Sequence, residues 1–198
     1  KGEEMETLSK FGVPLGDGTG RGGLLQLKYA YRFRVRVVNF GPIAGGLELT
    51  QQVQSVGKPK LEHAVIEVHS YNSTGYFAGK HKWDTIQLVL KDDVTNACTA
   101  LVGHQIQKQL NHLEQTGYLA GSNYKFTMLI ETLDGGNSTV LETWYCEGCF
   151  VSEFEEEGMD YKNGGEFQTM TLTIRCDNIT LTNGLMPDSP NKTPGDMV

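Results

Sequence analysis

The chain has 198 residues, of which 38% are hydrophobic, enough to build one sizeable core in one domain. Its formal net charge of −7 argues against tight binding to nucleic acid, which depends on lysine and arginine displacing counterions from phosphates. No run of about 18 apolar residues is present that would span a bilayer, and residues 1–10 lack the apolar centre of a signal peptide. We therefore expect a soluble intracellular protein.

The two ends of the chain have compositions that do not favour a packed core. Gly16–Gly23 reads GDGTGRGG, and residues 183–198 contain three prolines with few apolar side chains. We predict a flexible glycine-rich N-terminal arm at 1–23, one β-sandwich domain at 24–182 and an extended C-terminal tail at 183–198.

Strand patterns dominate the middle of the chain. Apolar and polar side chains alternate from Leu25 to Val37, a longer run than the usual strand of five or six residues. A strand of that length indicates a sheet that extends past one small domain or one that pairs with neighbours. Further strands are predicted at Leu47–Val53, Ala64–His69, Thr85–Lys91, Tyr124–Leu133, Thr139–Phe150 and Phe167–Arg175, the last three as a meander.

One segment has helical spacing instead. After Asp92 and Asp93, which suit a helix N-terminus, apolar residues recur every three or four positions and predict a helix over Val94–Gln115. The expected fold class is mainly β, a β-sandwich or barrel with one flanking α-helix that packs on a sheet face.

The segment Leu49–Lys60 reads LTQQVQSVGKPK and has few side chains that would pack. Polar residues, Gly57 and Pro59 separate two predicted strands there. We expect a projecting loop or hairpin.

Motifs for catalysis or cofactor binding fail in their context. Gly18-x-Gly20-x-x-Gly23 precedes a strand instead of a helix, and Gly75–Lys80 lacks the spacing of a phosphate-binding loop. The histidines show no metalloprotease spacing. We expect no catalytic residues, no cofactor and no metal.

The four cysteines leave two interpretations open. Cys146 and Cys149 have zinc-knuckle spacing, but no second pair exists, and their thiols converge only where Gly148 forms a bulge or turn. Free thiols are the preferred interpretation. Four Asn-x-Ser/Thr triplets keep open the alternative of a secreted, disulfide-bearing β-sandwich binding module.

The polar face of the first predicted strand carries a row of like charges that require acidic partners. Nucleic acid phosphates are one possibility, and carboxylates of a neighbouring strand or subunit are the preferred one. The cations are Lys28, Arg32, Arg34 and Arg36, and the candidate carboxylates are Glu131, Glu142 and Glu48.

Several short runs of the chain are informative together: HSYNS (69–73), GKHKW (79–83), DDVTN (92–96), VGHQIQKQ (102–109), GSNYKF (121–126), EGCF (147–150) and TLTIR (171–175). In these runs and in their order, residues 28–181 resemble the tail tube proteins of T4-like contractile bacteriophages.

The resemblance implies a virion protein without enzymatic activity. Six copies would form a ring whose inner strands join into one barrel, and stacked rings would form the tube through which DNA passes without specific binding. The implied partners are further copies of the chain, the tail sheath protein, and the baseplate tube-initiator, tape-measure and tail-terminator proteins. The particle would assemble in the host cytoplasm without a membrane anchor.

Three sets of site residues follow from this comparison as expectations. The implied ring-stacking loop contains Gln51, Gln52, Gln54, Ser55, Lys58 and Lys60. The candidates for charge pairing between subunits are Arg32, Arg34, Arg36, Glu131 and Glu142. The helix would face the sheath, with His104, Lys108 and Glu114 as contact candidates. A baseplate initiator or a secretion-system tube protein would have the same implied fold.

Overall fold

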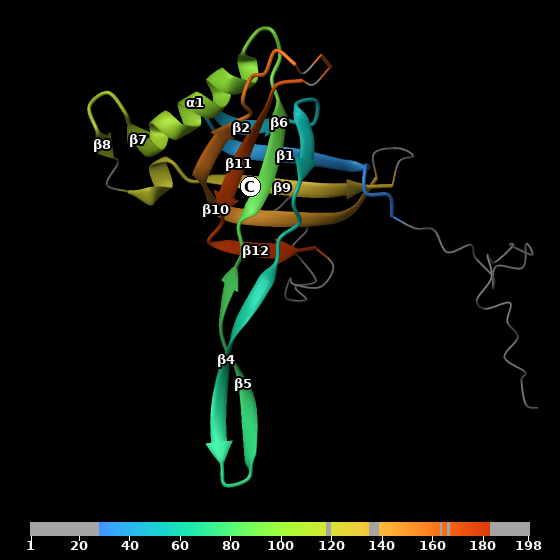
Figure 1. Ribbon diagram of the computed structural model, residues 1–198, viewed down its shortest axis with the longest axis vertical. Helices are drawn as coiled ribbons and strands as arrows, with labels where there is room; N and C mark the ends of the chain where they lie inside the picture. Colours follow the sequence, from blue (N-terminus) through green and yellow to red (C-terminus); the bar gives the residue numbers. More distant parts are fainter. Residues whose placement is uncertain (1–27, 118–119, 135–138, 163, 166, 183–198) are drawn as a thin grey trace, which may run out of the picture. The chain divides into compact units, whose positions relative to one another are not determined.

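The computed structural model describes residues 28–117, 120–134, 139–162, 164–165 and 167–182 (Figure 1). The chain divides into two units, residues 1–32 and 33–198, and the fold is that of the second. The predicted arm at 1–23 and tail at 183–198 lie outside the described residues. The described part is mainly β with α1 as its one α-helix, which confirms the predicted fold class.

The elements follow one another in short succession. The strands are β1 (Phe33–Phe40), β2 (Ile43–Glu48), β3 (Val53–Val56), β4 (Leu61–Ser70), β5 (Ser73–Trp83), β6 (Ile86–Lys91), β7 (Leu110–Asn111), β8 (Thr116–Gly117), β9 (Phe126–Leu133), β10 (Val140–Glu156), β11 (Thr169–Arg175) and β12 (Asn178–Leu181). The helices are α1 (Ala97–Gln109) and a short 3-10 turn at Gly121–Asn123.

Two antiparallel layers share the 17-residue strand β10. In one layer the order is β2-β1-β9-β10, with β12 on the free side of β10; in the other it is β10-β11-β6-β3. The predicted meander of β9, β10 and β11 is confirmed.

Strand β10 passes from one layer to the other at Gly148. This residue has a φ of +63°, and the pairing of β10 with β9 is interrupted between Cys146 and Cys149. A Cβ at this position would lie 2.3 Å from Oδ2 of Asp177. Only glycine meets both the left-handed backbone and the close approach.

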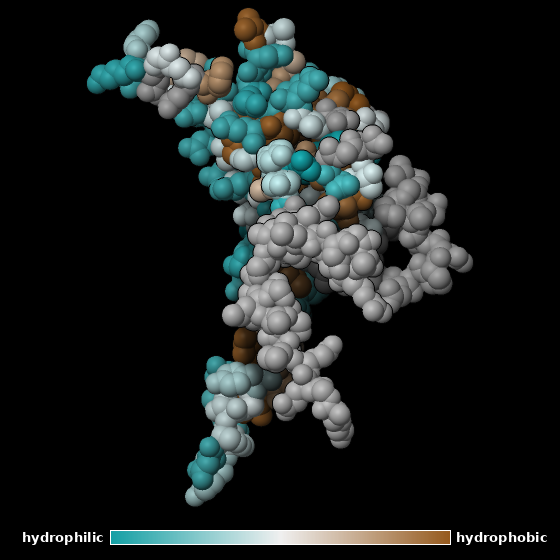
Figure 2. All heavy atoms as spheres, turned by 90° about the vertical axis from the view of Figure 1, so that its right-hand side faces the viewer, coloured by the Kyte–Doolittle hydropathy of each residue, from teal (hydrophilic) through white to brown (hydrophobic). Residues whose placement is uncertain are grey.

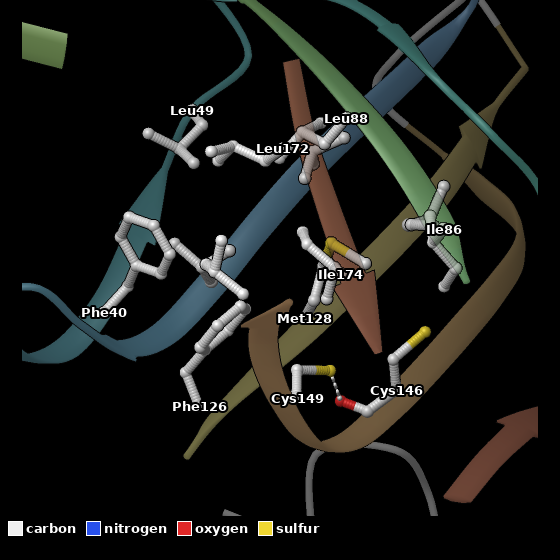
Figure 3. Packing of buried hydrophobic residues seen from close by; sticks show 14 of the residues in the cluster. Phe40, Leu49, Ile86, Leu88, Phe126, Met128, Cys146, Cys149, Leu172 and Ile174 are labelled. Atoms are coloured by element: carbon white, nitrogen blue, oxygen red, sulfur yellow. Dashed lines mark hydrogen bonds between the residues drawn. The ribbon is translucent and has the colours of Figure 1, made fainter. Parts of the chain in front are cut away.

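The core lies between the two layers and beneath α1. On β1, Val35 and Val37 point inward while Arg34 and Arg36 point to the opposite face, as the alternation predicts. Phe40 and Phe126 pack edge to face with ring centroids 4.8 Å apart. Figure 3 shows further members of the cluster: Leu49, Ile86, Leu88, Met128, Cys146, Cys149, Leu172 and Ile174.

Two glutamines attach α1 to the sheets. The fully buried amide of Gln105 accepts a hydrogen bond from Gly41 N (2.8 Å) and donates one to Tyr124 O (2.7 Å). One turn later, the Gln109 amide pairs with both N and O of Val151, at 2.9 and 2.8 Å. Because these backbone groups lie in buried or half-buried positions, the side chains replace partners that the sheets do not provide. The spacing of apolar residues in the sequence did not predict that these two glutamines bind the backbone of the sheets.

The first predicted strand starts later than expected. Within residues 28–32 the chain turns, with Arg32 N donating to Tyr29 O (3.2 Å) and the Arg32 guanidinium stacked 4.7 Å from the Tyr29 ring centroid. β1 then runs from Phe33 to Phe40. The local turn and cation–π contact compete with strand extension, so the prediction of a strand from Leu25 was wrong at Lys28–Arg32.

The predicted strand Leu47–Val53 was wrong because it crosses a turn between layers. Buried Leu49 ends the first run, and its carbonyl accepts hydrogen bonds from both Gln52 N and Val53 N, at 3.0 and 3.1 Å. The chain reverses there and Val53 enters the second layer as the first residue of β3.

The helix is shorter at both ends than Val94–Gln115. Asp93 Oδ1 accepts from Thr95 N and Ala97 N, so a turn held by this carboxylate precedes the first helical residue. At the other end, Asn111 Oδ1 accepts from Leu113 N at 3.1 Å, an Asx turn that competes with helix. Leu113 and Val94 are consequently exposed.

Candidate assembly interfaces

A charged triplet lies on the outer face of the β1–β9 pair. Arg34 Nε lies 2.5 Å from Glu131 Oε2, and Arg36 Nη1 lies 3.6 Å from Glu131 Oε1. Arg34 and Glu131 are direct cross-strand partners, and the Glu131 side chain is nearly buried. Two of the four cations, Arg34 and Arg36, thus lie beside a carboxylate of a neighbouring strand of the same chain, which is one of the two locations expected for the acidic partners.

The other charge-pairing candidates also have partners inside the chain. Glu142 Oε1 lies 2.9 Å from Lys58 Nζ and accepts a hydrogen bond from Trp144 Nε1. The Arg32 guanidinium contacts the rings of Tyr29 and Tyr31. The Glu48 side chain lies outside what the structure describes. Pairing of these residues between subunits stays a prediction.

The segment 49–60 is not a projecting loop. Val53–Val56 forms β3, which pairs with β6 and buries Val53 in the core. Gln51 and Gln52 lie in the preceding turn, Gln54 and Ser55 are exposed on β3, and the two lysines are held by carboxylates, Lys60 by Asp84 at 3.1 Å. The expectation of a loop was wrong because the apolar residues of this segment pack: Leu49 and Val53 are buried, and Val56 packs against the core. The stacking role of these residues is untested.

The segment that does leave the sheets is the β4–β5 hairpin, which extends below the sheets in Figure 1. Its base is anchored by Leu61 and buried Trp83, which face each other across the ribbon and pack on the core. A two-residue turn, Tyr71–Asn72, closes the tip. Beyond the base every residue of the hairpin is exposed except Gly79.

Both faces of this ribbon carry exposed apolar side chains. Directly opposed residues share a face, so Ile66 and Phe77 lie on one face and Val65 lies on the other with Tyr76. These side chains, with Val68, are 50–67% exposed. Figure 2 shows brown, hydrophobic atoms among the teal ones along the narrow lower part of the molecule. A two-stranded ribbon has no core of its own, because three or more strands or a packing partner are needed for stability.

Each layer also ends in an open edge within the described part of the chain. β2 and β12 are the outer strands of one layer, and β3 is an outer strand of the other. Unpaired edge groups form a template for another strand, which proteins cover, charge or use for assembly. β2 contains two glycines and no Lys or Pro that would blunt its edge.

Two of the three residues predicted to contact the sheath, His104 and Lys108, lie on α1. His104 is exposed, and Lys108 is half-buried with Nζ 3.3 Å from Asn39 Oδ1. Glu114 lies beyond the helix, in the turn between β7 and β8, where its carboxylate accepts from Asn111 Nδ2. The prediction that Glu114 lies on the helix was wrong because the helix ends at Gln109.

The C-terminal end of β10 is acidic. β10 continues past the predicted end at Phe150 to Glu156, so Glu153, Glu155 and Glu156 are exposed on this strand. Pairing with β11 through Glu156 and Met170 extends the strand.

Cys146 and Cys149 could converge only with a bulge or turn at Gly148, and the structure has that bulge. Gly148 forms the bulge, and Cys146 and Cys149 both point into the core, where all four thiols are free. No group of three or more His, Cys, Asp or Glu suited to a metal ion occurs among the residues that the structure describes. None of the described helices is long and apolar enough to cross a membrane.

The described residues form a mainly β fold of two antiparallel layers and one α-helix, and solved structures show where a similar fold occurs. A chain of the anti-feeding prophage baseplate matches at a TM-score of 0.63 and 13% identity, over 80% of this chain and 97% of that one. A chain of the anti-feeding prophage cap matches at 0.59 and 15%, over 84% and 99%.

A third match is a chain of the sheath–tube complex of an extracellular contractile injection system. It has a TM-score of 0.57 and 13% identity, over 79% of this chain and 92% of that chain. No family model matches the sequence, and no curated protein matches it. At this level of identity the similarity establishes a shared fold.

Proposed function

We propose that this chain is a structural subunit of the inner tube of a contractile bacteriophage tail. Six copies form a ring, the rings stack into a tube, and the tube conducts the genome out of the virion. The chain has no enzymatic role in this proposal. The T4-like tail tube resemblance and the fold shared with chains of contractile particles both support it.

The observation that carries the proposal is the β4–β5 hairpin. Its apolar residues lie on both faces and are exposed, so the isolated chain gains no burial energy from them. A second copy of the same chain is the proposed occupant, because a tube repeats one contact and every ring offers the same partner surface. The open edges of β2 and β12 support lateral joining within a ring.

The partners follow from the position of such a tube. The sheath protein is proposed to contact the exposed side of α1 near His104, and the baseplate initiator, tape-measure and terminator proteins to contact the tube ends and lumen. DNA passes without specific binding, since the chain is acidic and like charge prevents adhesion. The location is the virion, after assembly in the host cytoplasm.

A tube initiator or a secretion-system tube subunit would share this architecture. Copy number separates these roles, because a tube subunit is present in many rings and an initiator in few. A secreted binding module is the alternative from another class, and intact-mass measurement would reveal its glycans or disulfides.

Negative-stain electron microscopy of the purified chain tests the proposal. We expect six-fold rings or hollow tubes. Monomers alone at high protein concentration would count against it.

The hairpin is tested with paired substitutions on one face. Ile66→Ser with Phe77→Ser removes an exposed apolar pair and is expected to change the free energy of unfolding by only about 0.5 kcal/mol, since neither side chain packs on the core. Tube growth, followed by light scattering, should stop.

The matched control replaces a polar cross-strand pair near the tip, His69→Ser with Thr74→Ser. This variant should form tubes as the unmodified chain does. Normal growth of the Ile66/Phe77 variant would contradict stacking through the hairpin. Deletion of residues 51–57 is not a suitable test, because it removes β3 and the core residue Val53.

A further inference from the structure

Three thiols converge where β10 changes layer, and the assembly proposal does not use them. Residues three apart on a regular strand point to opposite faces, but the bulge at Gly148 turns Cys146 and Cys149 to the same side. Figure 3 shows both side chains at this bend, where Cys149 Sγ donates to Cys146 O at 3.3 Å. The third thiol, Cys176, follows the last residue of β11, and its Sγ lies 3.0 Å from Sγ of Cys149.

The register makes Cys149 and Cys176 direct cross-strand partners. β10 pairs Phe150 with Arg175 and, on β12, Glu147 with Asn178, so the intervening positions oppose Cys149 to Cys176. Directly opposed residues of an antiparallel pair have Cα atoms about 4.5–5.5 Å apart, within the about 4.4–6.8 Å that a disulfide spans. The spacing of opposed strands and the 3.0 Å between the two sulfurs are therefore compatible with a disulfide.

The pKa values of the three thiols shift in different directions. Hydrogen bonds to Cys176, reinforced by burial, raise the pKa of Cys146 and Cys149, whereas the same two hydrogen bonds lower the pKa of Cys176. Cys176 is 7% exposed and lies between exposed Arg175 and Asp177. Its lowered pKa favours the thiolate, which is the form that oxidants attack.

We propose that Cys149 and Cys176 are an oxidative modification site at which a small peroxide forms a disulfide between β10 and the end of β11. The Cys176 thiolate attacks hydrogen peroxide, takes one oxygen as sulfenic acid and releases hydroxide. The Cys149 sulfur then displaces that oxygen, forming the S–S bond. In sum, two thiols and one hydrogen peroxide give one disulfide and two waters.

Peptide mapping of the full-length, folded protein tests this. The reduced chain is treated with hydrogen peroxide, quenched with catalase, alkylated in denaturant and cleaved after lysine and arginine. We expect residues 126–162 joined to residues 176–192, with loss of two hydrogens and reversal by dithiothreitol. Fragmentation of the joined peptides should place the bond at Cys149. Free alkylated Cys176, or Cys176 carrying only sulfinic acid, would overturn the proposal.

Two variants and one internal control sharpen the result. Cys146→Ser should keep the joined peptides, and Cys149→Ser should lose them; the reverse pattern would overturn the assignment. Cys98 should stay alkylatable, since burial and the nearby Asp92 and Asp93 raise its pKa to about 11.

The unmodified chain and the Cys146→Ser variant should also show a reversible rise in Tm of roughly 5–10 °C on oxidation. Because the Tm is measured on the unmodified chain and on Cys146→Ser, the test holds even when Cys149→Ser does not fold. An unchanged Tm together with unjoined peptides would refute the site.

Discussion

At the scale of single residues, polar side chains decide how the apolar elements fit together. Gln105 is completely buried, yet its amide satisfies one donor and one acceptor of the backbone, from Gly41 and Tyr124. Gly41 itself has a φ of +60°, and a Cβ there would lie 2.9 Å from Leu101 Cδ1. The helix approaches the sheet this closely because one neighbour has no side chain and the other supplies hydrogen bonds.

Replacing Gln105 with methionine preserves volume but removes both hydrogen bonds. Two buried backbone groups lose their partners, so we expect a loss of about 2–4 kcal/mol in the free energy of unfolding. Urea denaturation measures it. Gln107→Met on the exposed side of the same helix, where the amide bonds only Asn111, should change stability by less than about 0.5 kcal/mol. Equal losses in both variants would show that the amide of Gln105 is not the cause.

At the scale of elements, the turn before α1 links a carboxylate to helix formation. Hydrogen bonding from the Thr95 side chain, then from the backbone of Ala97, lowers the pKa of Asp93. A carboxylate with a lowered folded pKa contributes stability above its unfolded pKa of about 3.9, and that contribution is lost as the pH falls through the folded value. The start of α1 is therefore weaker in acid than at neutral pH.

Substituting Asp93 with asparagine should reduce the acid sensitivity of the protein. We expect a smaller fall in the free energy of unfolding between pH 5 and pH 3 (roughly the window around the unfolded pKa) than in the unmodified chain. Thr95→Ala should act in the same direction, because it removes the largest contribution to the lowered pKa. Urea titrations by circular dichroism at several pH values measure both. A variant that retains the full acid loss would contradict the role of Asp93.

Two hairpins illustrate how elements depend on their surroundings. The β10–β11 hairpin is supported along its length by the core, since Val151, Met170, Leu172 and Ile174 are buried. The β4–β5 hairpin has comparable strand length and a similar apolar content, but its side chains beyond the base contact solvent. Sequence alternation alone does not separate these two cases.

At the scale of the whole molecule, charge and apolar surface act in opposite directions on assembly. Each chain carries a formal charge of −7, so copies repel one another at low ionic strength. Two of the three arginines named as candidates for contacts between subunits, Arg34 and Arg36, already lie beside Glu131 within the chain. Apolar contacts through the hairpin and strand edges are left as the main proposed attraction between copies.

Tube growth should consequently become faster and more extensive as salt rises from about 10 mM to about 150 mM, where the Debye length falls from about 30 Å to about 8 Å. Light scattering and sedimentation measure it. Replacing Glu153, Glu155 and Glu156 with glutamine changes the formal charge from −7 to −4 and should weaken the salt dependence. Growth that falls with added salt would instead indicate ion pairs between subunits.

The sequence by itself determined the class of fold, because alternation and helical spacing report which face of each element is buried. β4, β6, β9 and the β9–β10–β11 meander lie where the pattern predicted them, within a few residues. From the sequence, a bulge at Gly148 was only the condition for Cys146 and Cys149 to converge, and the structure decided that it forms.

The tertiary structure alone decided which polar side chains meet and which apolar strands stay uncovered. Gln105 and Gln109 bind backbone groups 19 to 64 residues away in sequence, and Cys176 meets Cys149 across 27 residues. Segment 49–60 had been expected to project, and it is the following hairpin that does so. A local pattern shows that a side chain can be buried, but only the arrangement of the other elements determines whether anything is there to bury it.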